Sequence, residues 1–410
     1  RCLFISNLLI LSIMNFEQNY QKVPIFLRPI IKKIASQFKL GSLSYRLPSG
    51  FEGKISGKLS GPDANIILHS WRPIFRLFFN GSIGFAEGYL AGEWDSSNLP
   101  TFIELVTKNS IHSENQGQLL LRKYNWFRHL INNNTRLGSK KNIAFHYDLG
   151  NEFYSYWLDN SMTYSSAIEI KNSQNLEDAQ QKKYSRILKS LEIKEDQHIL
   201  EVGCGWGGFA IFAAKEGFKV TGLTISNEQF NYANQLVGKL GLREKVSIKL
   251  CDYRDFSSKF DHIASIEMIE AVGENYWPKY FQSISQNLKK GGRFALQAIT
   301  VRDEKFEIYR KQPDFIQKYI FPGGMLPCQR SIKDNCNEVG MNIISDKGFG
   351  KDYASTLAIW RTSFHNAWPK IKSLGFDTRF KRLWSFYLAS CEGSFRGEGI
   401  DVRQIIMENN

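Results

Sequence analysis

Apolar residues between positions 180 and 300 follow two spacings that alternate along the chain. Short apolar runs, each about the length of a buried strand, recur at 198–202, 219–223, 246–250, 262–266 and 292–296. The stretches between these runs have the spacing of amphipathic helices. Strands that alternate with helices predict βαβ units, and therefore a doubly wound α/β domain around a parallel sheet.

The regions on either side of this segment have different patterns. Residues 41–110 alternate over short stretches and then show helical spacing at Phe102, Leu105 and Val106, which predicts a small α+β domain. Residues 300–410 are rich in aromatic residues and helix-like segments. We expect these last residues to form a helical cover over the sheet.

A basic amphipathic segment precedes the small domain. Apolar positions in residues 24–34 recur at helical spacing, with Arg28, Lys32 and Lys33 between them. The segment could be a helix that lies on a membrane surface. It could equally be a helix that packs on its own domain and exposes a basic face to solvent.

The net charge of the chain and its cysteines limit which binding partners and which cellular compartment we expect. The chain has 53 Lys and Arg against 40 Asp and Glu, a formal net charge of +13, which would draw it to nucleic acid or to an anionic bilayer. It has no zinc-finger or RNA-binding signature, so we expect a membrane surface and no nucleic acid. The six cysteines are scattered without a CxxC pair, which predicts neither a metal site nor a disulfide framework. We therefore expect a cytoplasmic protein that is peripheral at the inner membrane surface.

These patterns predict four parts of the chain. Residues 1–13 are apolar but too short to span a bilayer comfortably, and we expect them to lie upstream of the natural start or to form a disordered tail. A small lipid- or membrane-associating domain follows over residues 14–110. Residues 111–140 are polar and basic and are predicted to be a linker with one helix, before a large domain over 141–410.

A glycine-rich turn follows the first predicted strand of the sheet. The sequence from Glu201 to Gly208 reads EVGCGWGG, and a helix-like segment comes next. Glycines let a ligand approach the backbone, and a helix start offers free N–H groups. The pattern differs from the GxGxxG of dinucleotide sites and resembles motif I of class I methyltransferases, which bind S-adenosylmethionine. After the third strand, Asp252 could accept a hydrogen bond from the adenine amino group, or it could cap its own loop.

Several longer segments carry a resemblance to one family. They cover residues 145–154, 157–167, 268–273, 315–324, 352–360 and 391–396. In these segments the chain resembles the cyclopropane-fatty-acyl-phospholipid synthases, including the mycolic acid cyclopropane synthases. Residues 84–95 also resemble the small N-terminal domain of the full-length bacterial enzymes, so the resemblance covers nearly all of the chain.

The resemblance implies a class I S-adenosylmethionine-dependent methyltransferase fold, a bicarbonate ion beside the sulfonium, and a possible homodimer. The implied cofactor-binding residues are Tyr164, Ser165, Glu201, Gly203, Gly205, Thr224, Gln229, Asp252, Tyr253 and Arg254. The implied bicarbonate ligands, which we take as catalytic residues, are Ser166, Glu270, Gln297, Ile299 and Tyr353. No metal is implied.

The implied reaction adds one carbon to the double bond of an unsaturated phospholipid acyl chain. An alkene is a weak nucleophile, so it must be held close to the sulfonium methyl in a dry site. Aromatic faces can stabilise the carbocation that forms. Candidates for the substrate tunnel are Phe315, Tyr319, Phe321, Trp360 and Phe395, although ordinary core packing is an equally good interpretation of each.

The product depends on which carbon of the carbocation loses a proton. Loss from the transferred methyl closes a cyclopropane, and loss from a neighbouring chain carbon gives a methyl-branched or methylene chain. The chain departs from the family where Gln297 stands in place of a usual His, which keeps a donor but cannot change charge. A fatty-acyl C-methyltransferase is therefore the alternative to a cyclopropane synthase. A small-molecule methyltransferase and a non-catalytic lipid-binding protein are further alternatives.

Overall fold

The computed structural model describes residues 24–25, 28–29, 36, 38–111 and 149–410. The chain divides into two compact units, Arg1–Gly117 and Gln118–Asn410, which are described separately. The predicted tail, nearly all of the linker and most of the basic segment at 24–34 lie outside the described residues. None of the described helices is both long enough and apolar enough to cross a bilayer.

Over residues 38–111, unit 1 is a small sheet with two helices. The strands are β1 (Leu40–Arg46), β2 (Glu52–Ser56), β3 (Leu59–Leu68) and β4 (Trp94–Asp95), in the order β2-β1-β3-β4, and the helices are α3 (Arg72–Leu90) and α4 (Leu99–Ile111). Trp94 is fully buried, and its ring stacks on Phe85 at 4.5 Å between centroids. Of the three apolar residues that predicted the second helix, Phe102 and Leu105 are buried while Val106 is exposed. The α+β character predicted for this region is confirmed.

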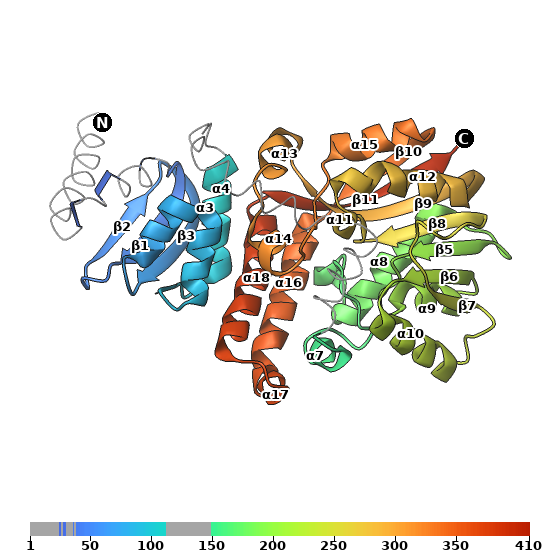
Figure 1. Ribbon diagram of the computed structural model, residues 1–410, viewed down its shortest axis with the longest axis horizontal. Helices are drawn as coiled ribbons and strands as arrows, with labels where there is room; N and C mark the ends of the chain where they lie inside the picture. Colours follow the sequence, from blue (N-terminus) through green and yellow to red (C-terminus); the bar gives the residue numbers. More distant parts are fainter. Residues whose placement is uncertain (1–23, 26–27, 30–35, 37, 112–148) are drawn as a thin grey trace. The chain divides into compact units, whose positions relative to one another are not determined.

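Unit 2 is built on a seven-stranded sheet (Figure 1). Its strands are β5 (His198–Val202), β6 (Lys219–Thr224), β7 (Val246–Leu250), β8 (Phe260–Ile266), β9 (Leu288–Val301), β10 (Met341–Gly348) and β11 (Ile400–Asn409). The order is β10-β11-β9-β8-β5-β6-β7, and the pairs from β7 to β9 are parallel. The predicted doubly wound sheet is confirmed.

Helices cover both faces of this sheet. They are α7 (Asn151–Ser155), α8 (Leu176–Leu191), α9 (Gly208–Lys215), α10 (Asn227–Lys239), α11 (Ile269–Val272), α12 (Trp277–Asn287), α13 (Asp303–Tyr309), α14 (Phe315–Tyr319), α15 (Gln329–Glu338), α16 (Gly350–Asn366), α17 (Trp368–Ser373) and α18 (Thr378–Arg396). Successive strand residues point to opposite faces, so Ile263 belongs to the core under α12 and α15 while Ala264 belongs to the core under α8, α9 and α10. A sheet buried on both faces explains why its strands read as continuous apolar runs.

The prediction that residues 300–410 form only a cover needs correction. Helices α16 and α18 pack against each other as expected, but β10 and β11 extend the sheet itself. Strand β11 runs antiparallel to β9 and lies between β9 and β10. The end of the chain is therefore part of the sheet.

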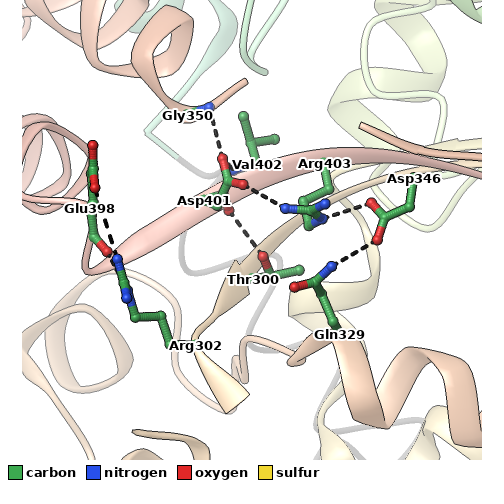
Figure 2. Close-up of polar contacts among 9 residues, drawn as sticks. All are labelled: Thr300, Arg302, Gln329, Asp346, Gly350, Glu398, Asp401, Val402 and Arg403. Atoms are coloured by element: carbon green, nitrogen blue, oxygen red, sulfur yellow. Dashed lines mark hydrogen bonds and ion pairs between the residues drawn. The ribbon is translucent and has the colours of Figure 1, made fainter. Parts of the chain in front are cut away.

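A polar network fixes the start of α16 to β11 (Figure 2). The Oδ1 atom of Asp401 accepts hydrogen bonds from the backbone N–H groups of Gly350, at 2.8 Å, and of Val402, at 2.9 Å. Its Oδ2 atom pairs with Arg403 at 2.8 Å, and Arg403 pairs in turn with Asp346 on β10 at 2.7 Å. A carboxylate at a helix N-terminus satisfies an otherwise free N–H and complements the helix dipole.

Replacing Asp401 with Ala should therefore destabilise the fold by about 1 kcal/mol, the usual cost of a lost helix cap. Urea unfolding followed by circular dichroism measures the change. Glu398→Ala is the control, because this side chain makes only an exposed ion pair with Arg302 at 3.9 Å, and such pairs contribute little. Equal stability of the two variants would contradict the capping role.

Candidate active site

The glycine turn after β5 has the backbone geometry that the sequence predicts. Gly203 and Gly205 have φ values of 81° and 53°, a region that side chains other than glycine rarely occupy. A Cβ atom on Gly203 would lie 2.6 Å from Cγ of Met268, whereas a Cβ on Gly205 would meet nothing within 4 Å. Helix α9 begins directly after the turn, at Gly208. The turn therefore leaves open space beside exposed backbone, where a ligand can approach, and this fits S-adenosylmethionine.

The turn lies at the point where the direction of winding reverses. Strands β5 and β8 are neighbours, and the chain proceeds from β5 to β6 on one side and from β8 to β9 on the other. Ligands of doubly wound folds bind outside the carboxyl ends of the strands at such a point. Of the residues predicted for the cofactor, Gly203 and Gly205 lie in the loop after β5, and Asp252, Tyr253 and Arg254 lie in the loop after β7. Glu201 and Thr224 lie near the ends of β5 and β6, and Gln229 lies in the first turn of α10.

Thr224 and Gln229 meet after β6. The Thr224 hydroxyl donates to Oε1 of Gln229 at 2.9 Å, and both side chains are buried. Ser226 lies between them and caps α10 by accepting from the Gln229 backbone N–H. The pair is therefore held rigidly, and its role at the ribose stays a prediction.

The loop after β7 favours the alternative interpretation of Asp252. The Arg254 guanidinium donates to the Asp252 carboxylate at 2.9 and 2.6 Å, and the Arg254 backbone N–H donates to it at 3.0 Å. Asp252 therefore organises its own loop, and any contact with adenine would share a carboxylate that is already engaged. Tyr253 packs against Tyr280 at 5.5 Å between ring centroids.

Ser165 contacts a buried lysine that sequence reasoning missed. Nζ of Lys183 donates to the Ser165 hydroxyl and to Oε1 of Gln180, both at 2.6 Å. Burial lowers the pKa of Lys183 to about 7, opposed by the charges of Glu267, Asp159 and Glu201. The missed signal was its position: Lys183 lies four residues after buried Ala179 and four before buried Ile187, on the apolar face of α8.

Glu201 and Tyr164 complete the predicted cofactor set. Burial raises the pKa of Glu201, whose Oε2 atom has no hydrogen-bond partner among the described residues. The Tyr164 hydroxyl lies 2.6 Å from the Tyr387 hydroxyl of α18. An unpartnered buried carboxyl oxygen at the end of β5 is consistent with a polar ligand group nearby.

The centre of the site is the carboxylate of Glu267, which immediately follows β8. Its Oε1 atom accepts hydrogen bonds from the Ser166 backbone N–H at 2.8 Å and from Nε2 of Gln297 at 2.7 Å. Its Oε2 atom accepts from the Tyr353 hydroxyl at 2.7 Å. Glu267 is surrounded by protein, so burial raises its pKa, while the three donors act in the opposite direction. The residue nevertheless keeps some accessible surface.

A chain of hydrogen bonds orients the Gln297 amide. Nε of Arg186 donates to Oε1 of Gln404 at 2.5 Å, and Nε2 of Gln404 donates to Oε1 of Gln297 at 2.9 Å. The Gln297 oxygen is thus occupied, which leaves its nitrogen to face Glu267. Hydrogen bonds arranged in this way polarise one another.

Glu270 lies one helical turn further, in α11. Its Oε1 atom accepts from the Ile299 backbone N–H at 2.5 Å, and its Oε2 atom has no partner among the described residues. Burial, and then the negative charge of Glu267, raise the pKa of Glu270 to about 8. At neutral pH Glu270 is therefore protonated, whereas the three donors to Glu267 favour the charged form of that carboxyl group against its burial.

This geometry changes the interpretation of the predicted anion site. Three of its five residues, Ser166, Gln297 and Tyr353, donate to Glu267, while Ile299 donates to Glu270. The donors expected to hold bicarbonate thus hold a carboxylate of the chain itself, and a bound bicarbonate does not fit this arrangement. Sequence reasoning missed Glu267, although the rule that pointed to Glu270, a carboxylate just past a strand at the ligand edge, applies to Glu267 equally.

The aromatic candidates form two groups in the cover. Phe395 and Trp360 lie 4.6 and 6.1 Å from the Tyr353 ring, between centroids, and Trp360 also lies 5.3 Å from Tyr164. Phe315 contacts Tyr319 at 5.3 Å, whereas Phe321 lies 6.2 Å from Tyr387, the hydrogen-bond partner of Tyr164. The first group packs against Tyr353, one of the three residues that donate to Glu267. Their role as walls of a substrate tunnel stays a prediction.

Comparison with known proteins identifies the family. A family model described as mycolic acid cyclopropane synthetase matches residues 135–405. The chain belongs to this family. Members of the mycolic acid cyclopropane synthetase family are S-adenosylmethionine-dependent methyltransferases, and the chain is an enzyme of this type.

Individual relatives agree with this assignment. The tuberculostearic acid methyltransferase UfaA1 of Mycobacterium tuberculosis is 38% identical over 344 residues, which cover 80% of this chain and 79% of the relative. The cyclopropane-fatty-acyl-phospholipid synthase of Escherichia coli K12 is 36% identical over 336 residues, which cover 81% and 84%. Among solved structures, the mycolic acid cyclopropane synthase CmaA1 complexed with S-adenosylhomocysteine and CTAB is 28% identical with a TM-score of 0.62, and the match covers 66% of this chain and 98% of CmaA1.

The protonation of Glu270 predicts how stability depends on pH. In the unfolded chain Glu270 ionises near its ordinary pKa of 4.5, whereas in the fold it stays protonated up to about pH 8. The stability linked to Glu270 is thus fully present below pH 4.5 and is lost as the pH rises through 8. Glu270→Gln cannot ionise, so it should gain on the order of 4 kcal/mol relative to the natural chain between about pH 5 and pH 9.

Urea unfolding of Glu270→Gln and of the natural chain, each at about pH 5 and about pH 9, measures this gain in stability. The control is Glu195→Gln, which replaces an exposed carboxylate of the same unit. A Glu270→Gln effect that is the same at both pH values would show that Glu270 titrates normally.

Proposed function

We propose that this enzyme transfers the methyl carbon of S-adenosylmethionine to the double bond of an unsaturated acyl chain of a phospholipid. The observation that carries the proposal is the convergence of the glycine turn and the Glu267 carboxylate at one edge of the sheet, beside the rings of Tyr353, Trp360 and Phe395. The turn fits the cofactor, the rings fit a cationic reaction centre, and the carboxylate fits a step that removes a proton.

The residues of the chain have separate parts in this reaction. When bound, S-adenosylmethionine supplies an electrophilic methyl group on a sulfonium, and the backbone at Gly203 and Gly205 would hold it. The buried rings of Trp360 and Phe395 would exclude water and face a developing positive charge with their electron-rich surfaces. The Glu267 carboxylate, which accepts from the hydroxyl of Tyr353 beside these rings, would stabilise the same charge.

Two products are compatible with this chemistry. The printed name of the E. coli relative supports ring closure to a cyclopropane on a phospholipid acyl chain. The second candidate is a methyl-branched chain, and two observations favour it: the relative at 38% identity is named a methyltransferase, and Gln297 occupies the position where the cyclopropane synthases usually have His.

The product can be determined directly. Incubation with vesicles of oleoyl phospholipid and methyl-labelled S-adenosylmethionine should move the label into the acyl chain and release S-adenosylhomocysteine. The added mass is the same for a cyclopropane and for a methyl-branched alkene, so proton NMR of the high-field ring methylene distinguishes them. Saturated phospholipid is the matched control, since it has no alkene to attack. Labelling of both lipids, or of neither, would contradict the proposed function.

We also propose that unit 1 contacts the membrane surface. Phe78 and Phe79 of α3 are 53% and 59% exposed, and their rings touch at 5.2 Å between centroids. Adjacent exposed aromatic rings on a basic protein suit insertion below anionic headgroups. This contact would keep the enzyme peripheral to the membrane that contains its substrate.

Replacing Phe78 and Phe79 together with Ala should lower binding to anionic vesicles about tenfold or more, because two apolar side chains no longer leave water. Vesicle co-sedimentation measures it, and binding of the natural chain should also weaken with salt. The control is Ile308→Ala, an exposed apolar residue of unit 2. Unchanged binding of the double variant would exclude this part of α3 from the contact.

A further inference from the structure

Glu267 occupies the place that an external anion would need. Its carboxylate accepts from a backbone N–H, an amide and a phenol that come from the loop before α8, from β9 and from α16. Such a set of convergent donors stabilises a negative charge inside a protein. We propose that the Glu267 carboxylate is the general base that removes the proton from the carbocation, so that the enzyme works without bicarbonate.

The backbone supports a specific role for this side chain. Glu267 has a φ of 51°, in the left-handed region where glycine is favoured. A strained non-glycine residue inside a site persists only when the surroundings hold it, and such residues concentrate at functional sites. Here the Glu267 backbone N–H donates to the Gln297 carbonyl at 2.8 Å, so main chain and side chain are both tied to β9.

The hydrogen bonds to the Glu267 carboxylate leave one of its lone-pair positions able to accept a proton. A carboxylate has about four lone-pair positions. Oε1 of Glu267 uses two, for Ser166 and Gln297, and Oε2 uses one, for Tyr353. The remaining position on Oε2 can accept the proton, and Glu267 as a whole residue is not fully buried.

The neighbouring groups favour the charged form of Glu267 before the reaction. Glu270 is protonated at neutral pH and so does not add a second negative charge. The buried ammonium of Lys183 attracts the Glu267 charge, and the chain from Arg186 through Gln404 polarises the Gln297 donor. Together these contacts favour the charged form of Glu267 beside a protonated Glu270.

The step balances without an oxidant or a reductant. The alkene π electrons form a C–C bond to the methyl carbon as the C–S bond breaks, and that pair stays on sulfur. A C–H bond of the resulting cation then breaks, and its electrons close the ring or form a new double bond. The proton goes to Oε2 of Glu267 and is afterwards released to water.

This inference rests on the proposed function, and Glu267→Gly tests it. Glycine suits the φ of this position, so the backbone should keep its conformation, while the three donors lose their carboxylate. In buffer freed of carbon dioxide, label transfer by the full-length natural chain should be unchanged, and transfer by Glu267→Gly should fall about 100-fold or more. Binding of S-adenosylhomocysteine, measured by calorimetry, should be unaffected.

Small carboxylates should then restore activity to this variant. Added bicarbonate or formate can occupy the space beside the three donors and should increase transfer by Glu267→Gly. They should not help Glu267→Gln, whose amide still fills that space. The matched control is Glu192→Gly, which removes an exposed glutamate with the same φ of 51° and should retain full activity.

The outcomes separate this inference from the proposed function. Transfer by the natural chain that requires bicarbonate, or full transfer by Glu267→Gly in bicarbonate-free buffer, would overturn the role of Glu267 and leave the proposed function standing. Loss of activity without rescue by either anion would assign Glu267 a structural role and also overturn the inference. No transfer by the natural chain under any condition would overturn both proposals.

Discussion

The arrangement of the active site depends on the hydrogen bonds that hold the Glu267 carboxylate. A buried charge is costly unless donors surround it, and here three donors come from separate segments of the chain, the nearest of which lies 30 residues from Glu267 in sequence. Ser166 lies in the loop between α7 and α8, Gln297 lies in β9, and Tyr353 lies in α16. The carboxylate is satisfied only when all three segments are in place, so formation of the site is coupled to completion of the fold.

The segment that carries Glu267 also connects the glycine turn, where the cofactor is expected, to the aromatic rings, where the acyl chain is expected. Met268, the residue after Glu267, lies against Gly203, so any side chain at Gly203 would displace the segment that carries both carboxylates. On the other side, Tyr353 contacts the rings of Phe395 and Trp360. Asp401 holds the beginning of the helix that bears Tyr353. The glycine turn, the charge and the aromatic rings thus have fixed relations, which a reaction that joins a sulfonium methyl to an alkene requires.

Much of this fold could be predicted from the sequence because a sheet buried on both faces leaves strong local signals. The strands His198–Val202 and Val246–Leu250 match the apolar runs to the residue. Strands β10 and β11 were missed because polar residues interrupt them and their pairing partners are distant in sequence. Sequence reasoning named several residues that contact the candidate site, but it missed Glu267 at its centre and the hydrogen bonds that join the others to it. Family resemblance pointed to Ser166, Gln297 and Tyr353, whereas what they bind depends on the side chain at 267, and a resemblance to motifs does not show contacts.

A crystal structure of the full-length chain with S-adenosylhomocysteine, grown or soaked in bicarbonate, tests the central claim most directly. We expect both Glu267 oxygens within hydrogen-bond distance of the Ser166 backbone N–H, Nε2 of Gln297 and the Tyr353 hydroxyl, with no separate anion between them. A Glu267 side chain turned away from these donors, with a planar anion in its place, would contradict the account.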